Sequence, residues 1–249
     1  MRNYIIFSDL DGTLLDHKTY TFEPASEALS VLKSRKIPLI LSSSKTKAEI
    51  EKIQSKLALK DPFIFENGSG VFFNNQVVSF GVNLTEIHDK IIPLQKTFNF
   101  NCYSLLPIEH AVQHTGLAEE EAKLSQQRQF SEPIIWLDDE EKKIEFIQII
   151  HQLGLHAAQG GRFLTISSHH DKAKALKWVK NTLEKDCQTE FISIALGDGE
   201  NDINMIDACD IKILIQNNNE HLHKPGWVMS KMCGPSGWNQ EIMKVLNNE

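Results

Sequence analysis

Short apolar runs alternate with helical patterns in the first part of the chain. Residues 4–7 and 37–41 are dominated by apolar side chains and are bounded by polar or turn-forming residues, which predicts two short buried strands. Between them, residues 23–35 place apolar side chains at helical spacing, with a proline near the start. A strand, a helix and a strand joined over this length predict a right-handed βαβ unit and therefore parallel strands.

The same alternation continues and then returns in the last third of the chain. Residues 46–49 have the pattern of a capping box and open a second helix, and residues 63–65 form a third apolar run. A long helix is expected to begin at Asp171, followed by strands at residues 192–196 and 212–215. We therefore expect an α/β fold with a parallel sheet formed from both ends of the chain.

The middle of the chain follows a different pattern from about residue 82. Helical stretches alternate with short β-like segments; the helical ones lie near residues 85–97, 118–127 and 140–153, and the β-like ones at residues 134–137 and 156–158. This texture predicts a compact α+β insertion. We expect residues 1–81 and 166–249 to form one core domain that is interrupted by a second domain, residues 82–165.

Two acids follow the first predicted strand directly. Asp9 and Asp11 precede Gly12, and residues i and i+2 of an extended segment point to the same side. They can face one small volume at the carboxyl end of a strand, where open α/β sheets bind ligands. Two close carboxylates need a cation or a proton, and Mg²⁺ with a phosphate satisfies both. The alternative for this motif by itself is a solvated turn.

Composition and charge restrict the choice of partners. The 249 residues are 41% hydrophobic and 24% charged, with a net charge of -7 and a pI near 5.8. This balance argues against nucleic acid or an anionic membrane as a partner. No apolar run approaches the length of a membrane span or a signal-peptide core, and the four cysteines lack C-x-x-C spacing. We expect a cytoplasmic protein, a monomer or weak homodimer, that acts on a small molecule.

Three further stretches follow the acids in order: residues 42–45 after the second strand, Lys172 at the start of a helical pattern, and residues 197–202 after a late apolar run. With F-S-D-L-D-G-T-L-L at residues 7–15, this series resembles the four motifs of haloacid dehalogenase-like (HAD) phosphatases. The resemblance covers most of the chain. It implies a Rossmann-like parallel-sheet core with an inserted α+β cap of the C2 type.

The resemblance also implies roles for the acids and for a metal ion. Asp9 would be the nucleophile that forms an aspartyl-phosphate, and Asp11 the general acid and base. The implied Mg²⁺ ligands are Asp9, Asp11 through its backbone carbonyl, Asp198, Asn201 and Asp202. The alternative for residues 197–202 is a solvated acidic loop, or a loop that mimics a Ca²⁺ site although it lacks the EF-hand spacing.

Two more residues complete the implied catalytic set. Ser43 would donate its hydroxyl to a phosphoryl oxygen, and Lys172 would pair with the phosphate and with Asp9. A serine after a strand is more often a helix cap, and a lysine that opens a helix is more often solvated. Ala173 follows this lysine, where the family often has glycine.

The predicted cap carries two short motifs with an arginine each. Residues 127–133 and 160–163, together with residues 43–46 and 66–68, resemble mannosyl-3-phosphoglycerate phosphatases, which release phosphate to form mannosylglycerate. The resemblance implies a set of residues that bind a substrate carrying a carboxylate and a sugar: Ser44, Lys45, Asn67, Arg128, Ser131, Gly161 and Arg162. Alternatively, the arginines are surface residues or stack on Phe130 and Phe163.

The implied activity is therefore a Mg²⁺-dependent phosphatase of mannosylglycerate biosynthesis. Three alternatives stay open at the level of the sequence. The chain could hydrolyse another sugar phosphate, it could be a phosphohexomutase that uses the same aspartyl-phosphate, or it could be a non-catalytic sugar-phosphate sensor. The intact Asp9, Asp11 and Asp198 argue against a sensor, because a sensor needs no nucleophile. The identity of the sugar does not follow from the sequence.

Overall fold

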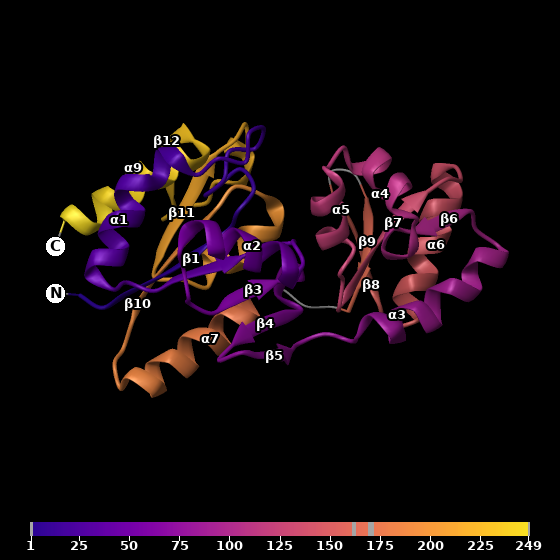
Figure 1. Cartoon of the computed structure of the whole chain (residues 1–249), viewed down its shortest axis with the longest axis horizontal. Helices are drawn as coiled ribbons and strands as arrows, with labels where there is room; N and C mark the ends of the chain where they lie inside the picture. Colours follow the sequence, from indigo (N-terminus) through magenta and orange to yellow (C-terminus); the bar gives the residue numbers. More distant parts are fainter. Residues whose placement is uncertain (1, 161–162, 169–171, 249) are drawn as a thin grey trace.

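Two β-sheets, each with its own helices, form the protein (Figure 1). The structure is a computed structural model that describes residues 2–160, 163–168 and 172–248. The larger sheet occupies the left part of Figure 1 and the smaller sheet the right part. The larger sheet is formed by residues before position 80 and after position 191, and the smaller one by residues between them. This arrangement confirms the predicted α/β core with an inserted α+β cap.

Eight strands form the larger sheet in the order β12-β11-β10-β1-β2-β3-β4-β5. The six strands from β12 to β3 are parallel, whereas β4 and β5 are antiparallel to their neighbours. The strands are β1 (Tyr4–Ser8), β2 (Leu39–Ser42), β3 (Phe63–Phe65), β4 (Gly70–Phe73), β5 (Gln76–Ser79), β10 (Ile192–Gly197), β11 (Ile211–Gln216) and β12 (Val228–Cys233).

Strand β1 lies in the middle of this sheet, between β10 and β2. Ser8, its last residue, pairs with Leu196 on one side and Leu41 on the other. The three strands are parallel, so their carboxyl ends meet at one edge of the sheet. The residues that follow them therefore converge, although they are far apart in the sequence.

Helices cover both faces of the larger sheet. Tyr4 and Ile6 of β1 pack in one apolar cluster with side chains of three helices, α1 (Ser26–Arg35), α2 (Lys47–Leu57) and α9 (Gly234–Asn247). Ile5 and Phe7 point to the opposite face, where their cluster includes side chains of α7 (Lys172–Cys187) and α8 (Ile203–Asp207). Burial on both faces explains why the strand is apolar throughout rather than alternating.

Four antiparallel strands form the smaller sheet in the order β6-β7-β9-β8. These strands are β6 (Phe100–Cys102), β7 (Ser131–Trp136), β8 (His156–Gln159) and β9 (Leu164–Ser167). The helices of this part are α3 (Leu84–Ile91), α4 (Ile108–Thr115), α5 (Glu119–Ser125) and α6 (Glu140–Gln152). α3 and α6 contribute Ile87, Phe146 and Ile150 to the apolar cluster of this sheet.

Several short helical turns join these elements. They are 3-10 helices at Glu23–Ala25, Glu66–Gly68, Ile92–Lys96, Tyr103–Leu105, Glu200–Asp202 and Glu220–Leu222. Within the described ranges, every helix is too short or too polar to cross a lipid bilayer.

The predicted elements and the observed ones differ at several places. The hairpin β4–β5, strands β6, β9 and β12, and helix α4 were not predicted. The long helix α7 begins at Lys172 in the described part of the chain, and the predicted start, Asp171, lies outside it. The predicted boundary between residues 165 and 166 falls inside β9, where Ile166 pairs with β7. The division into residues 1–81 with 166–249 and 82–165 stays a prediction.

Candidate active site

Asp9 lies at the centre of the converging strand ends. It directly follows β1, and its backbone N–H donates to the carbonyl of Leu196 in β10 at 2.9 Å. Its side chain is only 8% exposed. Burial, followed by the nearby charge of Asp202, raises the pKa of Asp9 well above its ordinary value, although Lys172 opposes this shift. A buried carboxylate at this position needs a cationic partner to stay ionised.

Lys172 supplies that cation. It is the first residue of α7 and is 1% exposed. Its Nζ lies 2.5 Å from Oδ1 of Asp9 and 2.6 Å from Oδ1 of Asp202, and it donates to the Ser42 carbonyl at 3.1 Å. Burial alone lowers the pKa of Lys172, but the two carboxylates outweigh burial and raise it above the ordinary value. Lys172 is therefore a fixed positive charge between two acids.

Asp198 is held in place by three side chains from two other loops. Its Oδ1 accepts a hydrogen bond from Thr13 Oγ1 at 3.0 Å, and its Oδ2 accepts one from Asn217 Nδ2 at 2.7 Å. Asn219 donates to its backbone carbonyl at 2.6 Å. Burial raises the pKa of Asp198, and the charge of Asp202 adds to this shift. No role was predicted from the sequence for Thr13, Asn217 or Asn219.

Asp202 orients the acidic loop with its second oxygen. Its Oδ2 accepts the backbone N–H groups of Asp198 and Gly199, both at 3.1 Å, while its Oδ1 contacts Lys172. The side chain of Asp202 is 1% exposed. Both of its oxygens are therefore engaged, so in this structure Asp202 positions Asp198 and Lys172.

A close approach between two loops brings Asp198 to the D-x-D segment. Gly12 has a φ of 81°, and a Cβ atom added there would lie 2.4 Å from Oδ2 of Asp198. Any side chain at this position would clash, and the backbone conformation also favours glycine. The glycine of the predicted turn is thus required for the acids of the two loops to meet.

The carboxylates at this site fit a hard divalent cation. Asp9, Asp198 and Asp202 each offer an oxygen, and these atoms lie within 4.8 Å of one another. Oδ1 of Asp11 is buried and has no hydrogen-bond partner among the described residues. An all-oxygen donor set of this kind suits Mg²⁺ better than a soft transition metal. Asn201 is exposed, and its amide donates to Asn67 Oδ1 at 3.3 Å.

A second group of possible ligands lies in the smaller sheet. His88, Cys102 and Glu132 also bring one ligand atom each within 4.8 Å of one another. Glu132 already accepts hydrogen bonds from the backbone and hydroxyl of Ser104 and contacts His88 Nε2 at 2.5 Å. This carboxylate is satisfied by protein groups, so the acidic group around Asp9 is the better candidate for a catalytic metal.

The segment after β2 places Ser43 and Lys45 beside the acids. Ser43 is 1% exposed, and its backbone N–H donates to the Ile64 carbonyl at 3.1 Å. Lys45 Nζ lies 2.7 Å from Oδ2 of Asp11. Burial lowers the pKa of Lys45, but the charges of Asp11 and Glu49 and the hydrogen bond to Asp11 together outweigh burial, so the pKa is raised. The structure therefore places Lys45, predicted to bind substrate, against the predicted acid and base.

Arg128, one of the predicted substrate-binding residues of the cap, contacts the same segment. Arg128 Nη1 donates to the Ser44 carbonyl at 2.9 Å and to Ser131 Oγ at 3.3 Å. Its Nε is buried and has no hydrogen-bond partner in the described part of the protein. In the structure Arg128 therefore contacts the core and Ser131, and it is not the free surface residue of the alternative prediction. Gly161 and Arg162 lie outside the described residues.

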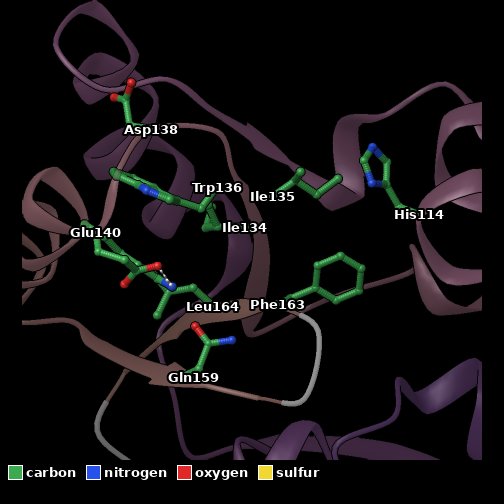
Figure 2. Close-up of a pocket in the computed structure, with 10 residues that line it drawn as sticks. His114, Ile134, Ile135, Trp136, Asp138, Glu140, Gln159, Phe163 and Leu164 are labelled. Atoms are coloured by element: carbon green, nitrogen blue, oxygen red, sulfur yellow. Dashed lines mark hydrogen bonds and ion pairs between the residues drawn. The ribbon is translucent and has the colours of Figure 1, made fainter.

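A hollow in the smaller sheet lies apart from these residues. It has a volume of about 440 Å³ and is lined by residues of β7 and of the segments around it. Figure 2 shows Trp136, Asp138 and Glu140 on one side of the hollow and His114 and Phe163 on the other. None of the described residues with a predicted role lines it. The candidate site is therefore the group of acids and lysines at the strand ends.

Comparison with known proteins agrees with this geometry. The profile of the haloacid dehalogenase-like hydrolase family matches residues 6–157 and 138–225. A glucosyl-3-phosphoglycerate/mannosyl-3-phosphoglycerate phosphatase from Persephonella marina is 35% identical over 262 residues, which cover 98% of this chain and 97% of that protein. A protein of the same name from Methanococcoides burtonii is 35% identical over 266 residues, with the same coverage of 98% and 97%.

The fold is also found among solved structures. A phosphatase of the HAD superfamily from Bacteroides thetaiotaomicron superimposes with a TM-score of 0.72 at 16% identity, and the match covers 99% of this chain and 96% of that one. At this identity the likeness concerns the fold only. The family profile and the two relatives show that the chain belongs to the haloacid dehalogenase-like hydrolases, and within them to the family of the glucosyl-3-phosphoglycerate/mannosyl-3-phosphoglycerate phosphatases.

Proposed function

We propose that the protein is a Mg²⁺-dependent phosphatase that hydrolyses a glycosyl-3-phosphoglycerate, with mannosyl-3-phosphoglycerate as the leading substrate. The products would be the glycosylglycerate and inorganic phosphate. The observation that carries the choice of substrate is the 35% identity, over 98% of the chain, to phosphatases named for the glucosyl and mannosyl compounds. The contacts around Asp9 support the reaction.

Asp9 is the nucleophile in this proposal. Lys172 contacts one of its oxygens at 2.5 Å, which keeps the buried carboxylate ionised and fixes its orientation. A carboxylate oxygen attacks phosphorus, the bond from phosphorus to the glycerate oxygen breaks, and an aspartyl-phosphate forms. Splitting the hydrolysis into two steps in this way lowers a barrier that is very high in water.

Asp11 handles the protons of both steps. In the first step it donates a proton to the departing glycerate oxygen. In the second it accepts a proton from the water that attacks the aspartyl-phosphate, so that Asp9 and phosphate are released and Asp11 is protonated again. The side chain of Asp11 follows β1 on the same short loop as Asp9, and Lys45 holds one of its oxygens at 2.7 Å.

Phosphate recognition falls to Ser43 and Lys172. Ser43 follows β2, the neighbour of β1, and its hydroxyl would donate to a phosphoryl oxygen. The ammonium of Lys172 would pair with the phosphate as well as with Asp9. Asp9, Asp198 and the Asp11 carbonyl would hold Mg²⁺, with Asn201 and Asp202 behind them. When bound, Mg²⁺ offsets the negative charge of the nucleophile and the phosphate.

The rest of the substrate would meet the cap and the turns next to it. A glycosylated phosphoglycerate carries a carboxylate, which an arginine can bind with two hydrogen bonds. Arg128 contacts the segment after β2, and its Nε is buried without a partner among the described residues. Gly161 and Arg162 are proposed to bind the substrate together with it. Ser44 and Ser131 contact Arg128, Lys45 contacts Asp11, and Asn67 contacts Asn201. These four residues are proposed as further substrate contacts.

A cytoplasmic setting and a monomer or weak homodimer complete the proposal. All four cysteines are free, which suits a reducing compartment. The mannosylglycerate formed by the reaction would place the enzyme in the biosynthesis of that compound.

Phosphate release from a substrate panel tests this function. The purified protein with Mg²⁺ is assayed on mannosyl-3-phosphoglycerate, glucosyl-3-phosphoglycerate, unglycosylated 3-phosphoglycerate and hexose phosphates, with Asp9→Asn as the matched inactive control. We expect the glycosylated phosphoglycerates to give the highest kcat/KM. A hexose phosphate that exceeds both would refute the proposed substrate. Transfer of phosphate to a bound sugar rather than to water would identify a mutase instead.

A further inference from the structure

Glu66 is a buried carboxylate to which the sequence analysis gave no role. It opens the short turn after β3 and is 1% exposed. Its Oε1 accepts the Gln129 N–H at 2.8 Å, and its Oε2 accepts the Phe130 N–H at 3.0 Å and the Ser131 hydroxyl at 2.5 Å. Within the described part of the chain, no lysine, arginine or histidine forms an ion pair with it. Three donors from one segment of the cap therefore satisfy a carboxylate of the core.

The backbone of this turn is fixed to the predicted phosphate-binding segment. Glu66 and Asn67 have φ values of 47° and 55°, in the left-handed region that non-glycine residues rarely adopt. The Glu66 N–H donates to the Lys45 carbonyl at 3.0 Å, and the Asn67 N–H donates to the Ser43 carbonyl at 2.9 Å. A strained turn persists only when its surroundings hold it, and here residues 43–45 supply those contacts.

Other contacts also join the core to the cap near Glu66. Thr46 Oγ1 donates to the Leu124 carbonyl at 2.9 Å, and Arg128 Nη1 reaches the Ser44 carbonyl at the same distance. The rings of Phe65 and Phe130 pack with centroids 5.8 Å apart. These hydrogen bonds to backbone carbonyls and the ring contact also join the core to the cap. Glu66 adds a buried charge that is satisfied only when residues 129–131 are seated on it.

We propose that Glu66 is a positioning residue for the cap. It sets the distance between residues 128–131 of the cap and residues 43–45 of the core, which include Ser43. This distance determines how well the glycosylated glycerate part of the substrate is held while its phosphate lies at Asp9. This inference rests on the proposed function. Binding energy from a remote part of a substrate accelerates the reaction only if that part is held in register with the reacting atoms.

The proposal predicts a selective loss of activity. Glu66→Gln keeps the shape of the side chain but replaces one acceptor oxygen with an NH₂ group, which faces donors. We expect kcat/KM for mannosyl- and glucosyl-3-phosphoglycerate to fall on the order of tenfold or more. The kcat/KM for p-nitrophenyl phosphate should change by less than about twofold, because this compound has no glycerate or sugar for the cap to hold. Glu145→Gln, an exposed carboxylate of α6, is the matched control.

Hydrogen exchange gives a second readout that needs no substrate. In Glu66→Gln we expect faster exchange of the Gln129 and Phe130 amides, and no change in those of the smaller sheet at Ile135. Glu66→Asp, which keeps the carboxylate but moves it away from the Gln129, Phe130 and Ser131 donors, should show the same substrate selectivity with a smaller loss. It carries the kinetic test if Glu66→Gln does not fold.

The outcomes distinguish a failure of the role proposed for Glu66 from a failure of the proposed substrate. Equal losses on the glycosylated and the aryl substrates in a folded variant, or no loss on either, would overturn the role of Glu66. A wild-type protein that cleaves p-nitrophenyl phosphate but no glycosylated phosphoglycerate would refute the proposed substrate instead. In that case unchanged exchange at Gln129 and Phe130 in Glu66→Gln would overturn the positioning role as well, and faster exchange would support it.

Discussion

Lys45 forms an ion pair with Asp11 at 2.7 Å, across the ends of two neighbouring strands. Both side chains are partly shielded, with exposed fractions of 18% for Lys45 and 29% for Asp11. The pair joins the residue proposed to handle protons to the segment that also carries Ser43. The lysine therefore holds Asp11 in place before a substrate arrives, whatever further contact it makes with the substrate itself.

Lys45→Ala tests this relationship. Loss of one hydrogen bond to a charged group is worth about 1.5–3 kcal/mol, so we expect kcat/KM to fall about 10- to 100-fold. Lys45→Arg should recover part of the activity, because it retains the positive charge. Steady-state kinetics on the glycosylated substrate provide the measurement, and wild-type rates in Lys45→Ala would contradict the role.

Asp9→Asn should abolish turnover without unfolding the protein. An amide cannot form the acyl phosphate, so we expect kcat to fall by at least about 10³-fold. Phosphate release is measured together with a circular dichroism spectrum. Substantial activity in a folded Asp9→Asn protein would show that another residue is the nucleophile.

Lys172→Met should lower stability as well as activity. The ammonium lies between the carboxylates of Asp9 and Asp202 and is fully buried, and breaking a buried ion pair costs about 3–5 kcal/mol. Urea denaturation at neutral pH in EDTA should show a loss of this order. Lys177→Met, on an exposed position of the same helix, should change the free energy of unfolding by less than about 0.5 kcal/mol.

Mg²⁺ should stabilise the folded protein through the acidic group. A ligand that binds only the folded state adds about 2.7 kcal/mol at a concentration 100 times its Kd. We expect the Tm to rise with Mg²⁺ concentration in the wild type and to rise much less in Asp198→Asn. A Tm shift of equal size in both proteins would place the ion elsewhere.

The pH dependence of stability in EDTA should reflect the raised pKa of Asp198. Its pKa in the folded protein lies above the ordinary value of 3.8, chiefly because of burial. As pH rises past 3.8, the unfolded chain releases this proton first, so the free energy of unfolding falls until the folded pKa is passed. Relative to Asp198→Asn, the wild type should therefore lose stability with rising pH in that window. Parallel curves from urea denaturation would contradict this assignment.

The sequence predicted five of the six parallel strands and missed β12, whose residues are mostly exposed. Strands β1, β2, β3 and β10 are unbroken or nearly unbroken apolar runs between turns, which is a strong pattern. The hairpin β4–β5 was missed although a local signal exists. Asn74 and Asn75 both have positive φ, 49° and 60°, and two asparagines between apolar stretches are typical of a tight hairpin turn.

The acids of the site could be predicted because they follow strands within recognisable motifs. The residues that hold these acids in place could not be predicted from the sequence. Asn217 and Asn219 lie in the loop after β11, where polar residues are ordinary, and only the fold brings their amides to Asp198. The same holds for Glu66, whose three donors come from a part of the chain more than sixty residues away. Asn217 and Asn219 meet Asp198 because β10 and β11 pair, and Glu66 meets its donors because the two sheets dock. No local pattern encodes either arrangement.

The central position of β1 also affects how the chain folds while it is being synthesised. β2 leaves the ribosome soon after β1, but β10, its other neighbour, is translated only after the whole cap. Until residues 192–197 have been made, one edge of β1 keeps unpaired backbone groups that can recruit strands from neighbouring nascent chains. A product that stops before β10 would lack Asp198 and Asp202, and it would be both inert and prone to aggregate.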